Sequence, residues 1–260
     1  MKVVHSISEL KLLVSTYKSE GKTIGFVPTM GALHDGHISL LQRSLETCDL
    51  SIASIYVNPS QFDQSSDFKS YPRNEIEDIS RLQEGGCDVV FIPEVEDVES
   101  LALPCSVELG ALESVMEGSN RPGHFKGVIE VVYRLFTAVQ PDRAFFGEKD
   151  FQQVMVVRKM VSDTNLNIEV VNCEILRETS GLAMSSRNVR LSPQGRIQAA
   201  RIYEVLIDDQ FNSEFIKLNE LKRLGFEVEY LEQHKLGDLS RLFVAVWLEG
   251  VRLIDNIAID

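Results

Sequence analysis

One stretch constrains the fold of this chain more than any other: residues 26–37, with the sequence FVPTMGALHDGH. The apolar run at residues 23–27 is short and predicts a buried strand. Further along, apolar side chains recur at helical spacing from Ile38 to Cys48, so we expect a helix to begin near His37. The stretch is therefore a strand, a glycine-containing turn and a helix N-terminus in direct succession.

This turn predicts an anion site. The first N–H groups of a helix lack intrahelical partners and the helix dipole is positive there, so a phosphate is stabilised. Gly31 and Gly36 allow close approach of the backbone to a ligand, and His34 and His37 add two donors less than one turn apart. A lone histidine at such a place is more often a cap or a packing residue. Two histidines that bracket a glycine favour a functional site.

Charge and cysteine spacing limit the partners of the chain. A net charge of −13 over 260 residues argues against a broad basic face for nucleic acid. No apolar run approaches the length of a membrane span, and the N-terminus does not resemble a signal peptide. The 4 cysteines are scattered without a CxxC pair, which suits free thiols in a reducing compartment. We therefore expect a cytoplasmic protein with small-molecule partners, and neither a nucleic acid nor a membrane.

Strands and helices alternate through most of the chain. Strands are expected at residues 23–27, 50–57, 88–93, 143–146 and 167–172, and helices at 7–19, 74–84 and 128–139. The helix at 74–84 is expected to direct Ile76, Ile79 and Leu82 inward, and residues 94–104 are expected to be irregular. The alternation predicts an α/β fold, a Rossmann-like doubly wound parallel sheet.

The pattern changes near residue 175, where a smaller C-terminal α+β domain is expected to begin. Helices are expected at 193–207 and 213–224, and strands at 226–231, 241–248 and 251–257, with a hairpin turn at Glu249-Gly250. We therefore expect two domains, residues 1–174 and residues 175–260.

Polar residues follow two of the expected strands, at the edge where open α/β sheets bind ligands. Gln61 follows the second strand, and its amide can both donate and accept hydrogen bonds. Lys149 follows the fourth strand and can place a positive charge near phosphate, or form a weak surface ion pair with Glu148 or Asp150. His124 can be a ligand contact or a packed loop residue, and the residues alone favour packing.

A third informative block is Ser185-Ser186-Arg187, in the expected C-terminal domain. Hydroxyl, backbone N–H and guanidinium groups in succession can bind phosphate oxygens. By itself this tripeptide is a weak signal, because many helix starts and loops contain it.

Together these blocks resemble the pantothenate synthetase family, a branch of the HxGH nucleotidylyl-transferase superfamily. The family patterns PTMGALHxGH, NPxQF, YPR, RPGHFxGV, FGEKDxQQ, LxMSSRN and RLIDN occur here in that order, over most of the chain. The resemblance implies ATP-dependent condensation of pantoate with β-alanine through a pantoyl adenylate. It also implies Mg²⁺ accompanying ATP, a homodimer, and a C-terminal domain that acts as a lid.

The resemblance further implies roles for residues that match the family motifs. His37 is the family's proton donor, and His34, Lys149 and Arg187 join it as catalytic residues. Gln61 and Gln153 match the pantoate-binding glutamines, with Met30 beside them, and Gln61 also serves β-alanine. No protein metal ligands are implied. The ATP-lining positions are Met30, Gly31, Ala32, Leu33, His34, Asp35, Gly36, His37, Gly147, Glu148, Lys149, Asp150, Leu176, Met184, Ser185, Ser186 and Arg187.

The chain departs from the family pattern at a few positions. Leu176 stands where many members have Val, and Glu130 and Arg134 stand where Thr and Lys are common. Two other functions stay open: a nucleotidylyl transferase acting on a phosphate substrate, and a non-catalytic ATP sensor. A dinucleotide oxidoreductase is disfavoured because no GxGxxG follows the first strand.

Overall fold

The computed structural model describes residues 1–62, 65–103, 106–236 and 239–259. The chain divides into two compact units. Unit 1 contains Met1–Glu148 and Gln152–Cys173, and unit 2 contains Lys149–Phe151 and Glu174–Asp260. Three residues that follow the fifth strand in sequence therefore cluster with the C-terminal part of the chain.

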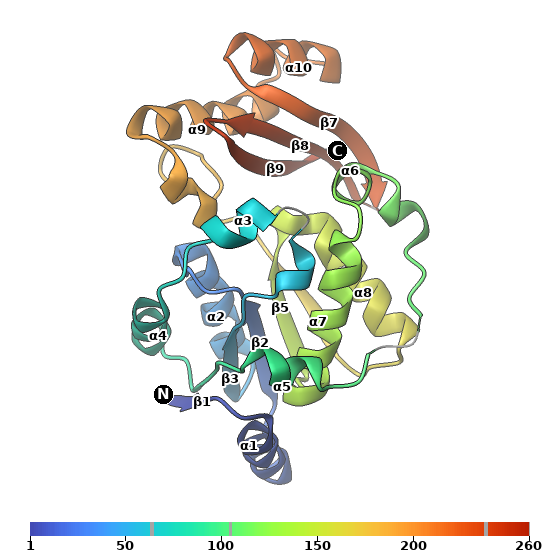
Figure 1. The fold of residues 1–260 in the computed structure, drawn as a ribbon. Coiled ribbons are helices and arrows are strands. Elements are labelled where there is room, and N and C mark those ends of the chain that lie inside the picture. The colour runs from blue at the N-terminus through green and yellow to red at the C-terminus, as the bar shows by residue number, and fades with distance from the viewer. Residues whose placement is uncertain (63–64, 104–105, 237–238, 260) are drawn as a thin grey trace. The chain divides into compact units, whose positions relative to one another are not determined.

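Unit 1 is built on a six-stranded parallel sheet (Figure 1). Its strands are β1 (Lys2–Val4), β2 (Ile24–Thr29), β3 (Leu50–Ile55), β4 (Val89–Phe91), β5 (Arg143–Gly147) and β6 (Glu169–Cys173), in the order β1-β4-β3-β2-β5-β6. The strand order reverses between β2 and β5, and crevices at such a switch point bind ligands in open α/β sheets. The predicted Rossmann-like sheet is confirmed.

Helices cover both faces of this sheet. They are α1 (Ile7–Ser19), α2 (Asp35–Thr47), α3 (Ser65–Ser70), α4 (Glu75–Glu84), α5 (Val95–Glu99), α6 (Met116–Asn120), α7 (His124–Val139) and α8 (Phe151–Asp163), with short 3₁₀ turns η1 (Pro59–Gln61), η2 (Gly110–Glu113) and η3 (Glu148–Asp150). Among the described residues, no helix has both the length and the apolar character needed to cross a membrane.

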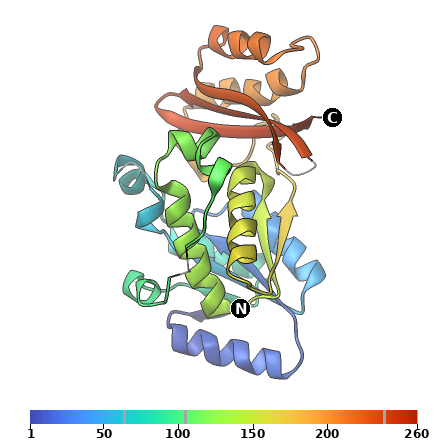
Figure 2. The same ribbon diagram turned by 90° about the vertical axis from the view of Figure 1, so that its right-hand side faces the viewer.

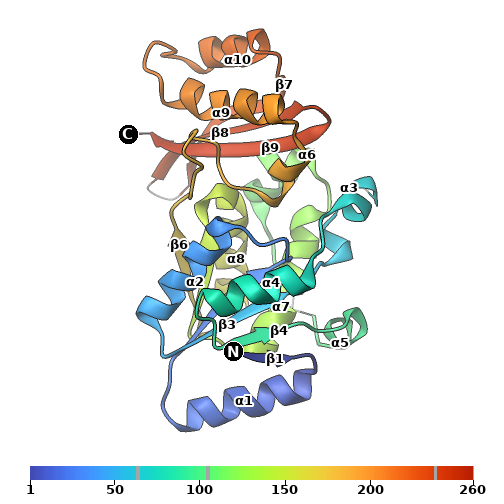
Figure 3. The same ribbon diagram turned by 90° about the vertical axis from the view of Figure 1, so that its left-hand side faces the viewer.

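Alternation along the strands creates two separate cores in unit 1, because successive side chains of a strand point to opposite faces. Phe26 packs with apolar residues of α1, α7 and α8, and Figure 2 shows α7 (green) and α8 (yellow) in front of the sheet. Its neighbour Val27 packs with residues of α2 and α4, the helices that face the viewer in Figure 3. Both faces are thus buried, as a parallel sheet requires.

Unit 2 contains an antiparallel sheet covered by helices. Its elements are the 3₁₀ turn η4 (Ser186–Arg190), α9 (Pro193–Ile207), α10 (Glu214–Arg223), β7 (Glu227–Leu236), β8 (Leu239–Leu248) and β9 (Val251–Ile259). Residues of α9, α10 and all three strands share one hydrophobic cluster. The expected hairpin turn is confirmed: Glu249 and Gly250 have φ of 52° and 72°, as a two-residue hairpin loop demands.

Two local expectations were wrong, and one short strand was missed. Ile76 is 84% exposed, whereas Asp78 is buried on the same helix at 2% exposure. Asp78 and Leu82 are four residues apart and share the inward face, and Ile76 lies off that face. Residues 95–99 form α5 where irregular chain was expected, and the edge strand β1 was not predicted.

Candidate functional site

The turn between β2 and α2 is held by its own two histidines. His34 is the N-cap of α2, and its Nδ1 accepts the N–H of Gly36 at 3.2 Å. The N–H of His34 donates in turn to Nδ1 of His37 at 3.3 Å, and the two ring centroids are 4.1 Å apart. Because each Nδ1 accepts, a neutral ring carries its proton on Nε2. Both histidines therefore cap the helix and can also present an N–H donor to a phosphate oxygen.

A buried carboxylate fixes the preceding residues of this turn. Gly31 and Ala32 both have left-handed backbone conformations, with φ of 73° and 49°. Asp78 of α4 accepts the N–H of Ala32 at 2.8 Å and that of Leu33 at 2.7 Å. A Cβ on Gly31 would lie 2.8 Å from Oδ2 of Asp78, so the fold itself requires glycine here.

Asp78 was missed by the sequence analysis. Burial raises the pKa of its carboxyl, and the two backbone N–H groups oppose that rise. One signal in the sequence could have indicated it: Asp78 lies four residues before Leu82, on the same face of the helix. Because charged side chains are rarely buried without partners, an aspartate on that face indicates a bonded carboxylate.

Gln61 lies next to Met30, so two of the expected substrate residues come together. The Gln61 side-chain amide donates to the sulfur of Met30, and its Oε1 accepts from Asn58 at 3.4 Å. Asn58 also caps η1 and donates to the carbonyl of Gly127 at 3.2 Å. A Cβ on Gly127 would lie 2.5 Å from the Ser60 carbonyl oxygen, so the glycine of the RPGHFxGV pattern permits η1 to pack on α7.

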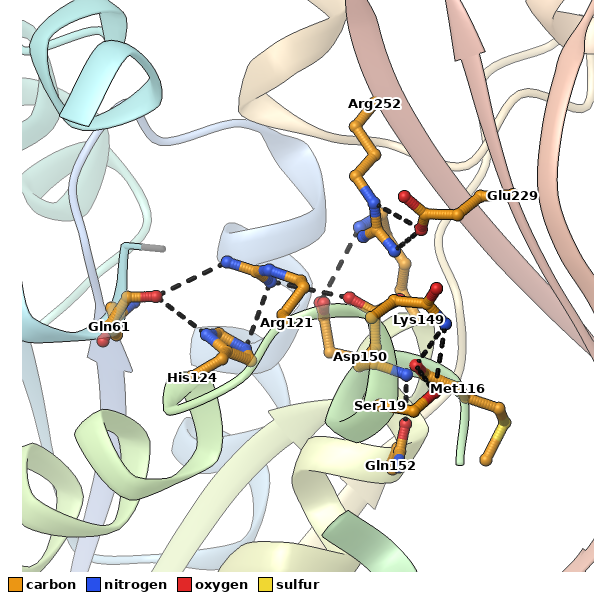
Figure 4. A network of polar contacts seen from close by, with 12 residues as sticks. Gln61, Met116, Ser119, Arg121, His124, Lys149, Asp150, Gln152, Glu229 and Arg252 are labelled. Atoms are coloured by element: carbon orange, nitrogen blue, oxygen red, sulfur yellow. Dashed lines mark hydrogen bonds and ion pairs between the residues drawn. The ribbon is translucent and has the colours of Figure 1, made fainter. Parts of the chain in front are cut away.

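The backbone of Gln61 is held by the RPGHF-like segment (Figure 4). His124, which is 8% exposed, donates from Nδ1 to the Gln61 carbonyl at 2.8 Å. Arg121 lies 3.2 Å from Nε2 of His124, and it also donates to the Gln61 carbonyl at 3.4 Å. A guanidinium can only donate, so Nε2 accepts and the proton is on Nδ1. His124 is therefore a packed loop residue that also holds the backbone of Gln61, an expected substrate residue.

The two consecutive glutamines at the start of α8 differ in environment. Gln152 is 3% exposed, and its amide bonds the N–H of Glu117 and the carbonyls of Leu112 and Val115 at 2.8 to 3.0 Å. It therefore fixes the chain around α6 (Figure 4). Gln153, the expected substrate residue, is half-buried.

Gly147 ends β5, beside β2 in the sheet, so both strands end at the same edge. The next residue, Glu148, accepts a hydrogen bond from Asn172 at 3.3 Å. Unit 1 thus contains the expected ATP positions Met30 to His37, Gly147 and Glu148, and the expected substrate residues Gln61 and Gln153.

In unit 2, Lys149 is attached to the C-terminal sheet through its backbone. Its carbonyl accepts from Nδ2 of Asn256 at 3.1 Å, and Oδ1 of Asn256 accepts from Arg241 at 2.7 Å. The Arg241 guanidinium lies over the ring of Phe151, 4.5 Å from its centroid. The Lys149 ammonium is 3.8 Å from the Asp150 carboxylate, and the lysine side chain is 18% exposed. Asn256 and Arg241 were also missed as supporting residues.

The Ser185-Ser186-Arg187 block follows a small antiparallel loop in unit 2. Arg177 bridges Ala183, and the N–H of Met184 donates to the carbonyl of Leu176 at 3.0 Å, so two expected ATP positions are adjacent. Arg177 makes a bidentate pair with Asp255 at 2.6 and 2.8 Å. The middle of β9, through Asp255 and Asn256, therefore supports both expected phosphate-binding segments of unit 2.

The block itself begins a 3₁₀ turn. Ser185 caps η4 and accepts the N–H of Arg187 at 3.3 Å. Ser185, Ser186 and Arg187 are half-buried, whereas Leu176 is 39% exposed. Unit 2 thus contains the remaining expected ATP positions Lys149, Asp150, Leu176 and Met184 to Arg187.

Two of the departures from the family pattern lie on α7. Glu130 lines a pocket of about 310 Å³ with Lys126, Glu113, Ser106 and apolar residues, and none of the expected site residues lines it. Arg134 donates to the carbonyls of Leu101 and Glu99 at 3.2 and 3.3 Å, which ties α5 to α7. Within the described part of the chain, no group of three His, Cys, Asp or Glu side chains forms a metal cage.

Comparisons with known proteins agree over almost the whole chain. The family model for pantoate-beta-alanine ligase matches residues 2–258. The pantothenate synthetase of Cytophaga hutchinsonii is 41% identical over 278 residues, covering 98% of each chain. That of Christiangramia forsetii is 45% identical over 269 residues, covering 95% of each.

Solved structures give the same result. The crystal structure of pantothenate synthetase from Thermus thermophilus has a TM-score of 0.90 at 40% identity, covering 99% of each chain. Pantoate-beta-alanine ligase from Francisella tularensis, complexed with beta-gamma ATP and beta-alanine, has a TM-score of 0.89 at 37% identity, covering 99% of this chain and 97% of that chain. On these matches, the chain belongs to the pantoate–β-alanine ligase family.

Proposed function

We propose that this chain condenses (R)-pantoate with β-alanine in two steps, through a pantoyl adenylate, using ATP. As a member of the ligase family the chain is an ATP-dependent enzyme of pantothenate formation. The observation that supports this mechanism most directly is the turn from Met30 to His37, where two histidine donors follow a residue that contacts Gln61. The proposed phosphate donors His34 and His37 thus lie on the turn whose Met30 contacts Gln61, the proposed substrate-binding amide.

In the first step a carboxylate oxygen of pantoate bonds to the α-phosphorus of ATP. The bond from that phosphorus to the bridging oxygen breaks, and diphosphate leaves. No protein nucleophile is needed, so catalysis depends on positioning and on positive charge around the phosphates. We assign charge stabilisation to His34, His37, Lys149 and Arg187, with His37 as proton donor.

In the second step the amine of β-alanine attacks the acyl carbon of the adenylate. The bond from that carbon to the phosphate oxygen breaks, AMP leaves, and the amine loses a proton. We assign Gln61 to pantoate and β-alanine and Gln153 to pantoate. An uncharged amide bonds hydroxyls and carboxylates without repelling them.

ATP is proposed to bind with Mg²⁺, which would neutralise part of the negative charge on the phosphate oxygens. ATP is proposed to be lined by main-chain and side-chain atoms of Met30 to His37, Gly147 to Asp150, Leu176, and Met184 to Arg187. Residues 1–174 and 175–260 are proposed to act as separate domains, with the second as a lid that contributes Ser185, Ser186 and Arg187.

A cytoplasmic homodimer is part of the proposal. Cys48, Cys87 and Cys173 are free thiols, the state that a reducing compartment maintains, and Cys105 lies outside the described residues. Dimerisation is an expectation from the family resemblance, and sedimentation equilibrium tests it.

ATP–diphosphate exchange, measured with and without pantoate, tests the function. Exchange that requires pantoate, followed by AMP release that requires β-alanine, is the expected result. Exchange driven by a phosphate-bearing substrate instead would establish a nucleotidylyl transferase. ATP binding without any exchange would establish a sensor.

A further inference from the structure

The turn that carries the proposed phosphate donors has a conformation that its own sequence does not favour. Gly31 and Ala32 are consecutive left-handed residues, with φ of 73° and 49°. Glycine adopts this region freely, but an alanine there brings Cβ close to the backbone. Such a conformation persists where surrounding structure over-determines it.

One side chain supplies that constraint. The carboxylate of Asp78 uses both oxygens, Oδ2 for the N–H of Ala32 and Oδ1 for the N–H of Leu33, at 2.8 and 2.7 Å. Bonds from N–H groups to a carboxylate are stronger than those between neutral groups. The N–H groups of Ala32 and Leu33 are therefore held by the side chain of Asp78.

The support of Asp78 is itself rigid. Asn74 caps α4, and Leu82, one turn beyond Asp78, packs in the hydrophobic cluster that contains Leu33 and Leu41. Asp78 is 2% exposed, and burial raises the pKa of its carboxyl against the effect of the two N–H groups. The backbone conformation of the turn is thus fixed by α4, since Asp78 lies 45 positions after Leu33 in the sequence.

We infer that Asp78 is a positioning residue for the proposed adenylation step: its side-chain oxygens hold Ala32 and Leu33 so that Met30 and His34–His37 are placed for the proposed binding of ATP and pantoate. Met30 lies two residues before Ala32, and His34 directly follows Leu33 as the N-cap of α2. A rotation at Ala32 or Leu33 displaces both ends of the turn relative to each other. The inference rests on the proposed function, and it adds a residue that touches no substrate.

The test compares Asp78→Asn with Asp142→Asn. Asp142 accepts the N–H of Ile24 at 2.7 Å, so it makes the same kind of bond at the opposite end of β2. Asparagine preserves size but replaces one oxygen with an N–H₂ group that faces a donor. Both variants are assayed by pantoate-dependent ATP–diphosphate exchange at a temperature where circular dichroism shows each to be folded.

We expect Asp78→Asn to lower kcat for exchange by about thirtyfold or more, with a smaller change in the KM for ATP, because a misplaced donor acts mainly on the transition state. Asp142→Asn should stay within about threefold of the original rate. Equal rates in the two folded variants would overturn the inference, since Asp78 would then only stabilise the fold. If the unmodified protein shows no pantoate-dependent exchange, the proposed function fails instead.

Two further measurements do not depend on that comparison. In Asp78→Asn/Ala32→Gly the left-handed residue is glycine, and we expect it to recover several-fold of the lost rate. Amide hydrogen exchange of the unmodified protein should show the N–H groups of Ala32 and Leu33 protected as strongly as β2. If these two N–H groups exchange hydrogen as fast as those of an open loop, the proposed role of Asp78 is refuted, even where Asp78→Asn fails to fold.

Discussion

Replacing Gln61 with glutamate tests the proposed substrate pocket by charge at nearly constant size. The change removes the donor that contacts the Met30 sulfur and retains an acceptor for Asn58, whose amide is 3.4 Å away. It also places a carboxylate where the pantoate carboxylate or hydroxyls are proposed to bind. Main-chain support is unchanged, because His124 and Arg121 bond the Gln61 carbonyl rather than its side chain.

The magnitude follows from the exposure of the site. Two like charges about 4 Å apart repel by roughly 1 kcal/mol in water and roughly 4 kcal/mol at an effective dielectric of 20. Gln61 is half-buried, so a value between these limits applies. We therefore expect the dissociation constant of pantoate to rise at least tenfold, about 1.4 kcal/mol.

Isothermal titration calorimetry with pantoate and with ATP, in separate titrations, measures the effect. Gln83→Glu is the matched control, because it adds the same charge at an exposed position on α4. Pantoate affinity should fall only in Gln61→Glu, while ATP affinity changes little. An equal loss for both ligands, or no loss for pantoate, would refute the assignment of Gln61.

The remaining predictions concern charge, support and thiol ionisation. Lys149→Ala and His37→Ala should each lower the single-turnover rate of adenylate formation by roughly a hundredfold, the usual effect of losing one preorganised donor. Asn256→Asp keeps the acceptor for Arg241 but loses the donor to the Lys149 carbonyl, so adenylation should slow by about five- to a hundredfold, on the order of 1–3 kcal/mol. Burial raises the pKa of Cys87 to about 11, from 9.0, so the folded state keeps a proton that the unfolded state loses. The free energy of unfolding, measured in urea, should therefore fall as pH rises from about 9 to about 11.

Each of these predictions has a contradicting result. Adenylate formation within about threefold of the original rate, on the order of 0.7 kcal/mol, would remove Lys149 or His37 from the charge assignment. For Asn256→Asp, a lower melting temperature with an unchanged rate would limit Asn256 to stability. A Cys87→Ala variant should show a shallower fall above pH 9, and an unaltered slope would assign the loss to other groups.

The architecture of this protein was predictable because it depends on local sequence. Alternating strands and helices specify a parallel sheet, since each βαβ unit must return the chain to the same edge. Ser192 and Pro193 mark the start of α9, and Glu249-Gly250 marks the β8–β9 hairpin. Each of these features lies within a few residues of the structure it determines.

The candidate site was predictable only where its residues form contiguous motifs. His34, His37 and Gln61 stand in recognisable blocks, and the structure adds what supports them. His124 reaches the Gln61 carbonyl across 63 positions, and Asn256 reaches the Lys149 carbonyl across 107. Neither pairing has a signal in the spacing of the sequence.

The sequence by itself therefore determined the parallel sheet, the strand–turn–helix junction that carries two histidines after β2, and the family to which the motifs point. Only the tertiary structure decided that Asp78 faces inward while Ile76 faces solvent, and that the Asp78 carboxylate binds the N–H groups of Ala32 and Leu33. Helical periodicity restricts which residues share a face, but the packing of α4 selects the buried one. A carboxylate is buried there because the folded turn supplies two N–H donors, and only the tertiary fold brings α4 next to that turn.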